Sequence, residues 1–426
     1  MKSKTAFHFL AGIAETDPAL AEVFENEGRR QQNQIELIAS ENLVSRAVLD
    51  ALGSQLTNKT VEGYPGKRFH GGAEFVDIAE RLAIERACEL FGARFANVQP
   101  HSGTQANQAV FLALLKPGDT ILSLSLSAGG HLSHGAPPNM SGKWFEVIHY
   151  GVRPDSCLID YEEAERVAVE RQPKLVITGG SDYPREIDFV RFRHIADLAG
   201  APLLVDMAHF AGLVAAGVHP SPVGLADVVT CTTYKTLRGP RGGVILSNDE
   251  TLAKRFDAAV FPGMQGSVHL STVAAKAVCL GEALNPAFRE YGKCVVTNAR
   301  ALAATLISNG VDVVTGGSDT HLVLLDLRSR GITGIQAEDA LAVVNITCNK
   351  NPIPFDPPSP SKWSGLRLGV SAGTTRGFGP QEFGEIGVVI AGRLDGAVSA
   401  EEGRARVASL CQRFPIYGHR SSVAAN

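Results

Sequence analysis

The sequence predicts an α/β fold in which a mostly parallel sheet is flanked by helices, with an N-terminal helical arm and a smaller C-terminal α/β domain. Two observations predict it. From residue 95 onwards, short β-branched and aliphatic runs alternate with segments of helical periodicity, the pattern of successive βαβ units. The chain also has 426 residues, 44% of them hydrophobic and 20% charged, enough for two domains of ordinary globular composition. We place the arm at 1–50, the large domain at 51–285 and the small domain at 286–426.

The composition argues against several classes of protein. A formal net charge of -4 provides no basic surface for nucleic acid. The 7 cysteines are scattered without a CxxC pair, which argues against a disulfide framework or a zinc site. Met1–Thr5 does not lead into the long apolar segment of a signal peptide, and no stretch approaches the roughly 18 apolar residues of a membrane span. We therefore expect a cytoplasmic protein that binds neither nucleic acid nor membrane.

The first elements are expected to be two helices joined by a loop. A helix over 17–35 would be capped by Asp17, and a second helix over 74–92 follows from the spacing of its apolar residues. Between them lie the apolar run 35–42 and the turn-rich loop 62–72. The apolar residues of the two helices include Leu20, Val23, Phe24, Phe75, Ile78 and Leu82.

The later elements follow the alternation of strands and helices. Apolar and β-branched runs predict the strands of the large domain at 95–98, 120–124, 175–178, 203–205, 228–232 and 244–246. A helix over 108–115 follows the first of them. The small domain is expected to contain a helix over 286–309, a strand over 322–327, a helix over 335–344 and a proline-rich loop over 352–360.

A single lysine, Lys235, stands between the predicted strand 228–232 and a turn rich in glycine and proline. Open α/β sheets bind their ligands at the carboxyl ends of the strands. An amine that is partly desolvated there has a lowered pKa and is a nucleophile for an aldehyde. The commoner alternative is a lysine that extends into water.

Asp206 favours the first interpretation, because it ends the apolar strand before that of Lys235 and is followed by His209. A strand ending in Asp and then one ending in Lys is the order expected of an enzyme that uses pyridoxal phosphate (PLP). The Asp keeps the pyridine nitrogen protonated, and the Lys carries the aldehyde covalently.

Ser102, Gly103 and Thr104 follow a predicted strand and precede a helix. Small residues at a helix N-terminus present free N–H groups to a phosphate. A simple helix cap is the commoner meaning of Ser or Thr there. The lysine and the aspartate described above favour the phosphate site.

His131 and His134 lie in a glycine-rich loop. No carboxylate or cysteine stands at ligand spacing beside them, so we expect no metal, and stacking of one imidazole on a flat cofactor ring fits better. Arg367 lies at the end of a strand of the small domain. Its planar fork suits the α-carboxylate of an amino acid, with a surface ion pair as the alternative.

The motifs resemble those of the serine hydroxymethyltransferase family of fold-type I PLP-dependent transferases. The similarity extends over nearly the whole chain. It is carried by IELIASEN (35–42), LTNKTVEGYPGKRFHGG (56–72), ANVQPHSGTQAN (96–107), GGHLSHG (129–135), VDMAHFAGLVAAG (205–217), KTLRGPRGG (235–243), FPGMQG (261–266) and NKNPIP (349–354).

The resemblance implies a role for each matching residue. Lys235 would bind PLP covalently. The other cofactor contacts would come from Ser102, Gly103, Thr104, His131, Ser181, Asp206, His209, Thr232, Tyr234 and, from a partner subunit, Gly266. Ser40 and Arg367 would bind the substrate carboxylate, and tetrahydrofolate would contact Leu126, Gly130, Leu132 and Asn351.

The partner subunit would also supply Glu62, which would move the proton of the substrate hydroxyl as the Cα–CH2OH bond breaks. The captured one-carbon unit would pass to tetrahydrofolate. A site shared in this way makes a homodimer the smallest active unit, and dimers could pair into tetramers.

The chain departs from ordinary serine enzymes of the family beside the substrate. Those enzymes have Tyr where this chain has Thr60, and Tyr-Tyr where it has Phe69 and His70. They have His in place of Tyr234 and of Ala128. Thr for Tyr frees volume near the substrate, enough for an extra methyl group. The pattern is similar to the branch that acts on 2-methylserine and releases D-alanine.

Three hypotheses follow. The first is hydroxymethyl transfer from 2-methylserine, which Thr60, His70 and Tyr234 favour. The second is serine/glycine hydroxymethyl transfer, with those substitutions tolerated. The third is a PLP protein without this transfer chemistry, or a folate-independent aldolase. The presence of Lys235 and Glu62, and of the loop 349–351 expected to bind folate, argues against the third.

Overall fold

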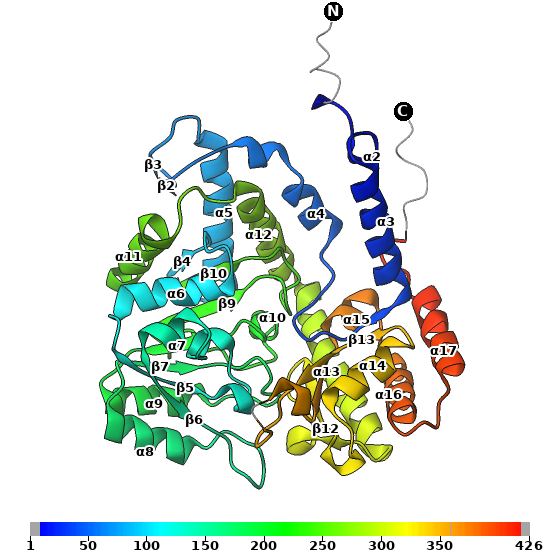
Figure 1. Cartoon of the computed structure of the whole chain (residues 1–426). Coiled ribbons are helices and arrows are strands. Elements are labelled where there is room, and N and C mark those ends of the chain that lie inside the picture. Colours follow the sequence, from blue (N-terminus) through cyan, green and yellow to red (C-terminus); the bar gives the residue numbers. More distant parts are fainter. Residues whose placement is uncertain (1–8, 358, 419–426) are drawn as a thin grey trace, which may run out of the picture.

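The computed structural model describes residues 9–357 and 359–418. Met1–Thr5 and Pro358, which belong to two of the expectations above, lie outside these ranges. Two sheets organise the chain, a seven-stranded one and a four-stranded one (Figure 1). Within the described residues, no helix is both long and apolar enough to cross a membrane.

The large sheet is mostly parallel, as predicted. Its strands are β4 (Phe95–Asn97), β5 (Thr120–Leu124), β6 (Glu146–Tyr150), β7 (Leu175–Thr178), β8 (Leu203–Asp206), β9 (Val228–Thr232) and β10 (Gly243–Ser247). The order is β4-β10-β9-β8-β7-β5-β6, and only β10 runs antiparallel to its neighbours. All six predicted strands form, and β6 at the edge is the one that the sequence pattern did not indicate.

Both faces of this sheet are buried, because alternate residues of each strand enter different apolar clusters. Ile177 and Leu204 pack with Phe111 of α6 (Gly103–Leu114) in one cluster. Val176 and Leu203, one position away on the same strands, belong to the main core on the other side. Period-two burial on both faces explains why the strands read as continuous apolar runs.

The helices of the large part cover the sheet and its ends. Besides α6 they are α4 (Arg46–Leu52), α5 (Glu74–Phe91), α7 (Met140–Trp144), α8 (Tyr161–Arg171), α9 (Phe189–Ala199), α10 (Ala211–Ala215), α11 (Glu250–Ala258) and α12 (Leu270–Ala283). α12 packs against α4 and α5. α6 begins five residues earlier than expected, since Ser102 is its N-cap.

The second sheet is antiparallel throughout and follows the long helix α13 (Pro286–Ser308). It consists of β11 (Asp312–Val313), β12 (Leu322–Asp326), β15 (Gly365–Gly369) and β14 (Asn349–Asn351), in that order. Its helices are α14 (Gly334–Ala342), α15 (Ser371–Arg376), α16 (Pro380–Leu394) and α17 (Ala400–Arg413). Arg367 lies within β15 rather than at a strand end.

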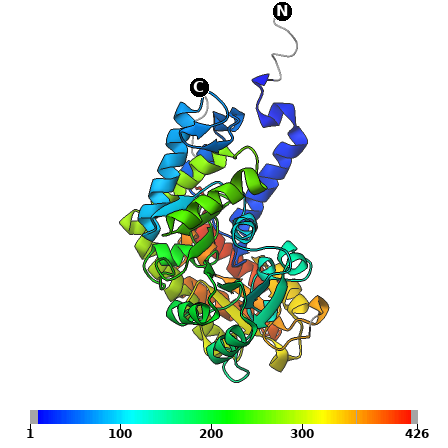
Figure 2. The same ribbon diagram turned by 90° about the vertical axis from the view of Figure 1, so that its left-hand side faces the viewer.

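The N-terminal arm joins the second sheet's side of the molecule. It contains α2 (Ile13–Thr16) and α3 (Pro18–Asn33), and the Asp17 side chain accepts from the N–H of Leu20 as the expected N-cap. β1 (Ile35–Glu36) pairs with β13 (Ile346–Thr347). α3 projects from the body beside α17 (Figures 1 and 2).

Candidate active site

Ten of the eleven residues predicted to bind the cofactor line one cavity at the carboxyl ends of β8 and β9. They are Ser102, Gly103, Thr104, His131, Ser181, Asp206, His209, Thr232, Tyr234 and Lys235. His134, Gly180 and Ala208 complete the lining. The exception is Gly266, which was predicted to act from a partner subunit.

The Lys235 amine is buried in this cavity, with the residue only 5% exposed. Burial lowers the pKa of the amine to about 8, although the nearby Asp206 carboxylate acts in the opposite direction. Within the described residues the amine forms no salt bridge. A buried amine of this kind is available for covalent bonding to an aldehyde.

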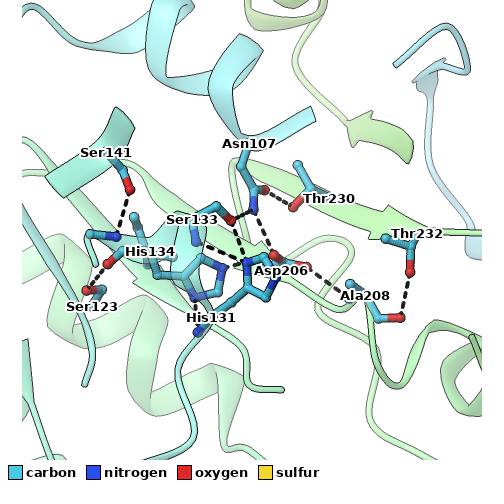
Figure 3. A network of polar contacts seen from close by, with 12 residues as sticks. Asn107, Ser123, His131, Ser133, His134, Ser141, Asp206, Ala208, Thr230 and Thr232 are labelled. Atoms are coloured by element: carbon cyan, nitrogen blue, oxygen red, sulfur yellow. Dashed lines mark hydrogen bonds and ion pairs between the residues drawn. The ribbon is translucent and has the colours of Figure 1, made fainter. Parts of the chain in front are cut away.

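Asp206 is held as an anion at the end of β8 (Figure 3). Its Oδ2 lies 2.9 Å from Nε2 of His134 and accepts a 2.8 Å hydrogen bond from Asn107, and its Oδ1 accepts from the N–H of Ala208 at 3.0 Å. Burial alone would raise the pKa of this carboxyl, but the bond with His134 outweighs it, and the pKa lies below its usual range.

His131 faces the cavity beside this network. Its Nδ1 lies 2.7 Å from the hydroxyl of Ser133 and accepts from the Ser133 N–H at 3.1 Å (Figure 3). Burial lowers the pKa of His131 to about 4, so the ring is neutral at physiological pH. A neutral imidazole with its Nδ1 occupied presents a flat face for stacking.

Along the sequence no carboxylate stands at ligand spacing beside the two histidines, but the fold brings one to them. Ligand atoms of His131, His134 and Asp206 lie within 4.8 Å of one another. Asp206 is distant in sequence, so spacing along the chain could not show it. His134 and Asp206 are already hydrogen-bonded to each other at 2.9 Å. His134 therefore supports the Asp206 carboxylate, as residues around a functional group commonly do.

The turn before α6 is shaped for a close approach. The Ser102 hydroxyl accepts from the N–H of Gln105 at 3.1 Å, so it caps the helix as the alternative interpretation required. The neighbouring Gly103 has no room for a side chain, because a Cβ would lie 2.6 Å from Cγ2 of Thr232. The cap and the free helical N–H groups therefore coexist, and the turn retains its capacity for an anion.

Arg367 of β15 contacts Ser181, a residue of the cavity lining, without lining the cavity itself. Its guanidinium donates to the carbonyl of Ser181 at 3.1 Å and to Oδ1 of Asp182, and it donates to Oδ1 of Asn349 at 3.2 Å. Asp182 thus occupies the guanidinium that a substrate carboxylate would require. Ser40 lies in an adjoining cavity that shares Tyr234 as a lining residue.

His209 of the cavity lining forms a buried pair with His321, which the sequence did not indicate. Nε2 of His321 lies 3.1 Å from the carbonyl of Ala39 and 3.3 Å from Nδ1 of His209. Because a carbonyl oxygen can only accept, Nε2 of His321 carries the hydrogen. Nδ1 of His209 can then accept, which leaves its Nε2 as a donor.

Glu62 and Gly266, the residues assigned to a partner subunit, do not line this cavity. Thr60 and His70, which were expected to contact the substrate and act in the reaction, are exposed and do not line it either. Glu62 and Gly266, which were both predicted to act across an interface, are neighbours, since a Cβ on Gly266 would lie 3.6 Å from Oε1 of Glu62. Thr60 and His70 belong to the same loop as Glu62, whose carbonyl accepts from the N–H of Phe69 at 3.1 Å.

Of the predicted folate contacts, Leu126 and Leu132 are exposed, by 37% and 49%. Gly130 cannot carry a side chain, because a Cβ would lie 2.2 Å from the carbonyl oxygen of Leu124. Asn351 is buried, and its amide donates to the carbonyl of Pro352 at 2.8 Å. Their role stays a prediction.

Comparisons with known proteins agree with the motifs. A family model described as serine hydroxymethyltransferase matches residues 13–390. The chain is 60% identical, over 98% of its length, to the whole of a 2-methylserine hydroxymethyltransferase from Aminobacter sp. A 2-methylserine hydroxymethyltransferase from Paracoccus sp is 59% identical over 98% of this chain and 100% of its own.

Relatives named serine hydroxymethyltransferase are equally similar to this chain. A serine hydroxymethyltransferase from Acidiphilium cryptum is 61% identical over 96% of this chain and 97% of its own. Overall identity therefore does not separate the two kinds of relative, whereas the family itself is unambiguous. The chain belongs to the serine hydroxymethyltransferase family.

Proposed function

We propose that this enzyme transfers a hydroxymethyl group from 2-methylserine to tetrahydrofolate, giving D-alanine and 5,10-methylenetetrahydrofolate. The observation that carries the choice of substrate is Thr60, which stands where ordinary serine enzymes of the family have Tyr. The relatives named for 2-methylserine support it. Transfer from L-serine is the alternative, supported by relatives named for serine.

The cavity fits PLP as its cofactor. Lys235 offers a buried amine without a salt-bridge partner among the described residues, and Asp206 is an anion for the ring nitrogen. Ser102 and Gly103 would hold the phosphate, and His131 the ring face. When bound, the cofactor withdraws electrons from Cα of the amino acid.

The chain's own groups then orient the substrate. Arg367 would exchange Asp182 for the α-carboxylate, with Ser40 beside it. Glu62 of the partner would accept the proton of the substrate hydroxyl. A 2-methyl substrate has no Cα–H, so no proton can be removed from Cα. The bonds that can break at Cα are then those to carbon, and transfer of the hydroxymethyl group requires cleavage of the Cα–CH2OH bond. Leu126, Gly130, Leu132 and Asn351 would bind tetrahydrofolate, which receives the one-carbon unit.

A homodimer is the smallest unit that would bring these groups together. Glu62 and Gly266 do not line the cavity of their own chain. Apolar side chains near them are exposed, with 76% of Phe69 and 75% of Phe75 accessible, as a buried interface would require. We place this dimer in the cytoplasm.

The test is to identify products from the PLP-loaded enzyme. It is incubated with 2-methyl-L-serine or L-serine, each with and without tetrahydrofolate, and D-alanine and glycine are measured. We expect folate-dependent D-alanine, with little glycine. Thr60→Tyr should reduce D-alanine formation at least about tenfold. The added ring would fill the space that the 2-methyl group needs, and one carbon in a fitted pocket changes kcat/KM by roughly 10–200-fold. Glycine as the dominant product would establish the alternative.

A further inference from the structure

A buried lysine that the mechanism does not use lies beneath the cofactor cavity. Lys276 of α12 is only 1% exposed. Its ammonium donates to three backbone carbonyls, those of Val98 at 2.6 Å, Pro100 at 2.9 Å and Gly243 at 2.9 Å. An ammonium has three hydrogens, so each one is used.

These carbonyls belong to the backbone that carries the phosphate cup, which we define as Ser102–Thr104. Val98 and Pro100 lie between the end of β4 and the cup. Gly243 opens β10 just after the Lys235 loop, and its N–H donates to the Pro100 carbonyl at 2.9 Å. A Cβ on Gly243 would lie 2.5 Å from the carbonyl oxygen of Ser102. Lys276 is therefore one residue removed from the cup.

A second side chain completes the support. The Gln265 amide donates to the carbonyl of Gln99 at 3.0 Å and accepts from the N–H of His101 at 3.0 Å. The three consecutive carbonyls of residues 98–100 thus all accept hydrogen bonds from side chains. This segment has left the strand, so these bonds hold it in place of a sheet ladder.

The charge of Lys276 has no counter-ion in its surroundings. Among the described residues no carboxylate lies within ion-pair distance, and the nearby Glu80 is paired with Arg68. Burial lowers the pKa of Lys276 to about 7, which reflects this lack of compensation. The residues assigned to the cup are themselves uncharged, and Lys276 is a buried cation bonded to the backbone that leads into it.

We propose that Lys276 is a positioning residue of the phosphate cup, which holds its backbone through three carbonyls and supplies the buried positive charge that favours a phosphate dianion there. The inference rests on the proposed binding of PLP. It is independent of which amino acid is the substrate.

The test compares binding of PLP and of pyridoxal, which lacks the phosphate, to the apoenzyme by absorbance titration. The variants are Lys276→Met, which keeps the length without charge, and Lys276→Gln, which also keeps hydrogen-bond donors. The control is Asn298→Leu in α13. It also removes a buried side-chain donor, because the Asn298 amide donates to the carbonyl of Phe378 at 2.9 Å. Thermal unfolding of each apoenzyme establishes that it is folded.

We expect both Lys276 variants to lower the preference for PLP over pyridoxal at least about tenfold, since hydrogen bonds from a charged group are stronger than those between neutral groups. Asn298→Leu should keep the native preference even if it is less stable. A native preference in a folded Lys276→Met or Lys276→Gln enzyme would overturn the inference. Failure of the native chain to bind PLP would instead contradict the proposed function.

Discussion

Burial acts on Lys235 and Asp206 in the same direction, against charge, but the two residues end in opposite states. The Asp206 carboxylate is supported by hydrogen bonds from Asn107, His134 and the backbone, which keep it ionised. The Lys235 amine has no such support, and its pKa falls to about 8. The site therefore contains a fixed anion next to an amine that titrates close to physiological pH.

The rate of PLP uptake by the apoenzyme should rise with pH with a midpoint near 8, because the neutral amine is the nucleophile and its pKa is lowered to about 8 from 10.5. Between these values the unfolded chain binds the extra proton, so this group's contribution to folding stability also increases with pH over that window. Stopped-flow absorbance measures the uptake. A midpoint above about 10 would contradict the geometry of a desolvated amine.

His134→Leu should weaken PLP binding about tenfold or more, because a buried carboxylate that loses a charged or polar partner costs roughly 1–3 kcal/mol. The reason is a raised pKa of Asp206, so the loss should be larger at low pH. His219→Leu is the matched control, since His219 is buried and bonded to the Pro220 carbonyl at 2.9 Å but does not line the cavity. Equal PLP affinity in both variants would refute a role for His134.

At this scale the sequence predicted which residues share the cavity but not how they support one another. Asp206 and Lys235 could be paired because each ends a strand, and neighbouring strands end at one edge. His134 stood in a quoted motif, yet its bond to Asp206 joins residues that are distant along the chain. His321 and Lys276 carry no local signal at all, because a lone buried histidine or lysine is identified only by its contacts.

Among the elements, the loop that carries Glu62 is fastened to α5 by buried ion pairs. Arg68 donates to Oδ1 of Asp77 at 2.9 Å, to Glu80 and to the Gly63 carbonyl, and its side chain is only 4% exposed. Burial would raise the pKa of Asp77, but Arg68 and the Gly66 N–H lower it. Arg68 and the 2.7 Å hydrogen bond from the Gly66 N–H to Oδ2 of Asp77 therefore hold the loop against α5.

Arg68→Met should lower the free energy of unfolding by about 3–5 kcal/mol, because it removes the buried cation that is paired with both Asp77 and Glu80. The triple variant Arg68→Met, Asp77→Asn, Glu80→Gln should recover much of this loss, since the unpaired charges are gone. Urea unfolding of the apoenzymes measures both. A single variant as stable as the native chain would show that the pairs are not what holds the loop.

The sequence predicted the bounds of helices and strands better than it predicted which of their faces are buried. β7 has the predicted bounds, and α5 ends at Phe91 before Gly92, whose φ of 68° suits a glycine C-cap. However, Phe75 and Ile78 of α5 are 75% and 52% exposed, while Val76 and Ala83 are buried. Helical spacing alone could not tell the core face from a second apolar face. β6 was missed because it lies at the edge of the sheet, where only Tyr150 of its five residues is buried, and it does not form a continuous apolar run.

At the scale of the whole molecule, the exposed apolar residues and the placement of Glu62 point to the same conclusion. Val23 and Phe24 of the projecting arm are 56% and 58% exposed, as are Phe69 and Phe75 on the side of Glu62, by 76% and 75%. A single chain would leave these surfaces in water. Two chains would cover them and complete two sites.

Mixing two inactive variants should restore activity if the site is shared. Lys235→Ala and Glu62→Gln each remove one essential group. A heterodimer of the two retains one intact site, made of Lys235 from one chain and Glu62 from the other. Co-refolding equal amounts should therefore give about a quarter of native activity. No activity in the mixture, with heterodimers verified by mass, would mean that both groups act within one chain.

The most direct measurement is a competition between the two substrates in one reaction. Native, PLP-loaded enzyme receives equal concentrations of 2-methyl-L-serine and L-serine with excess tetrahydrofolate, and D-alanine and glycine are quantified at early times. Their ratio gives the ratio of kcat/KM directly. Because one methyl group in a fitted pocket changes this ratio by roughly 10–200-fold, D-alanine should exceed glycine at least about tenfold. An excess of glycine would contradict the proposed substrate and leave serine as the better one.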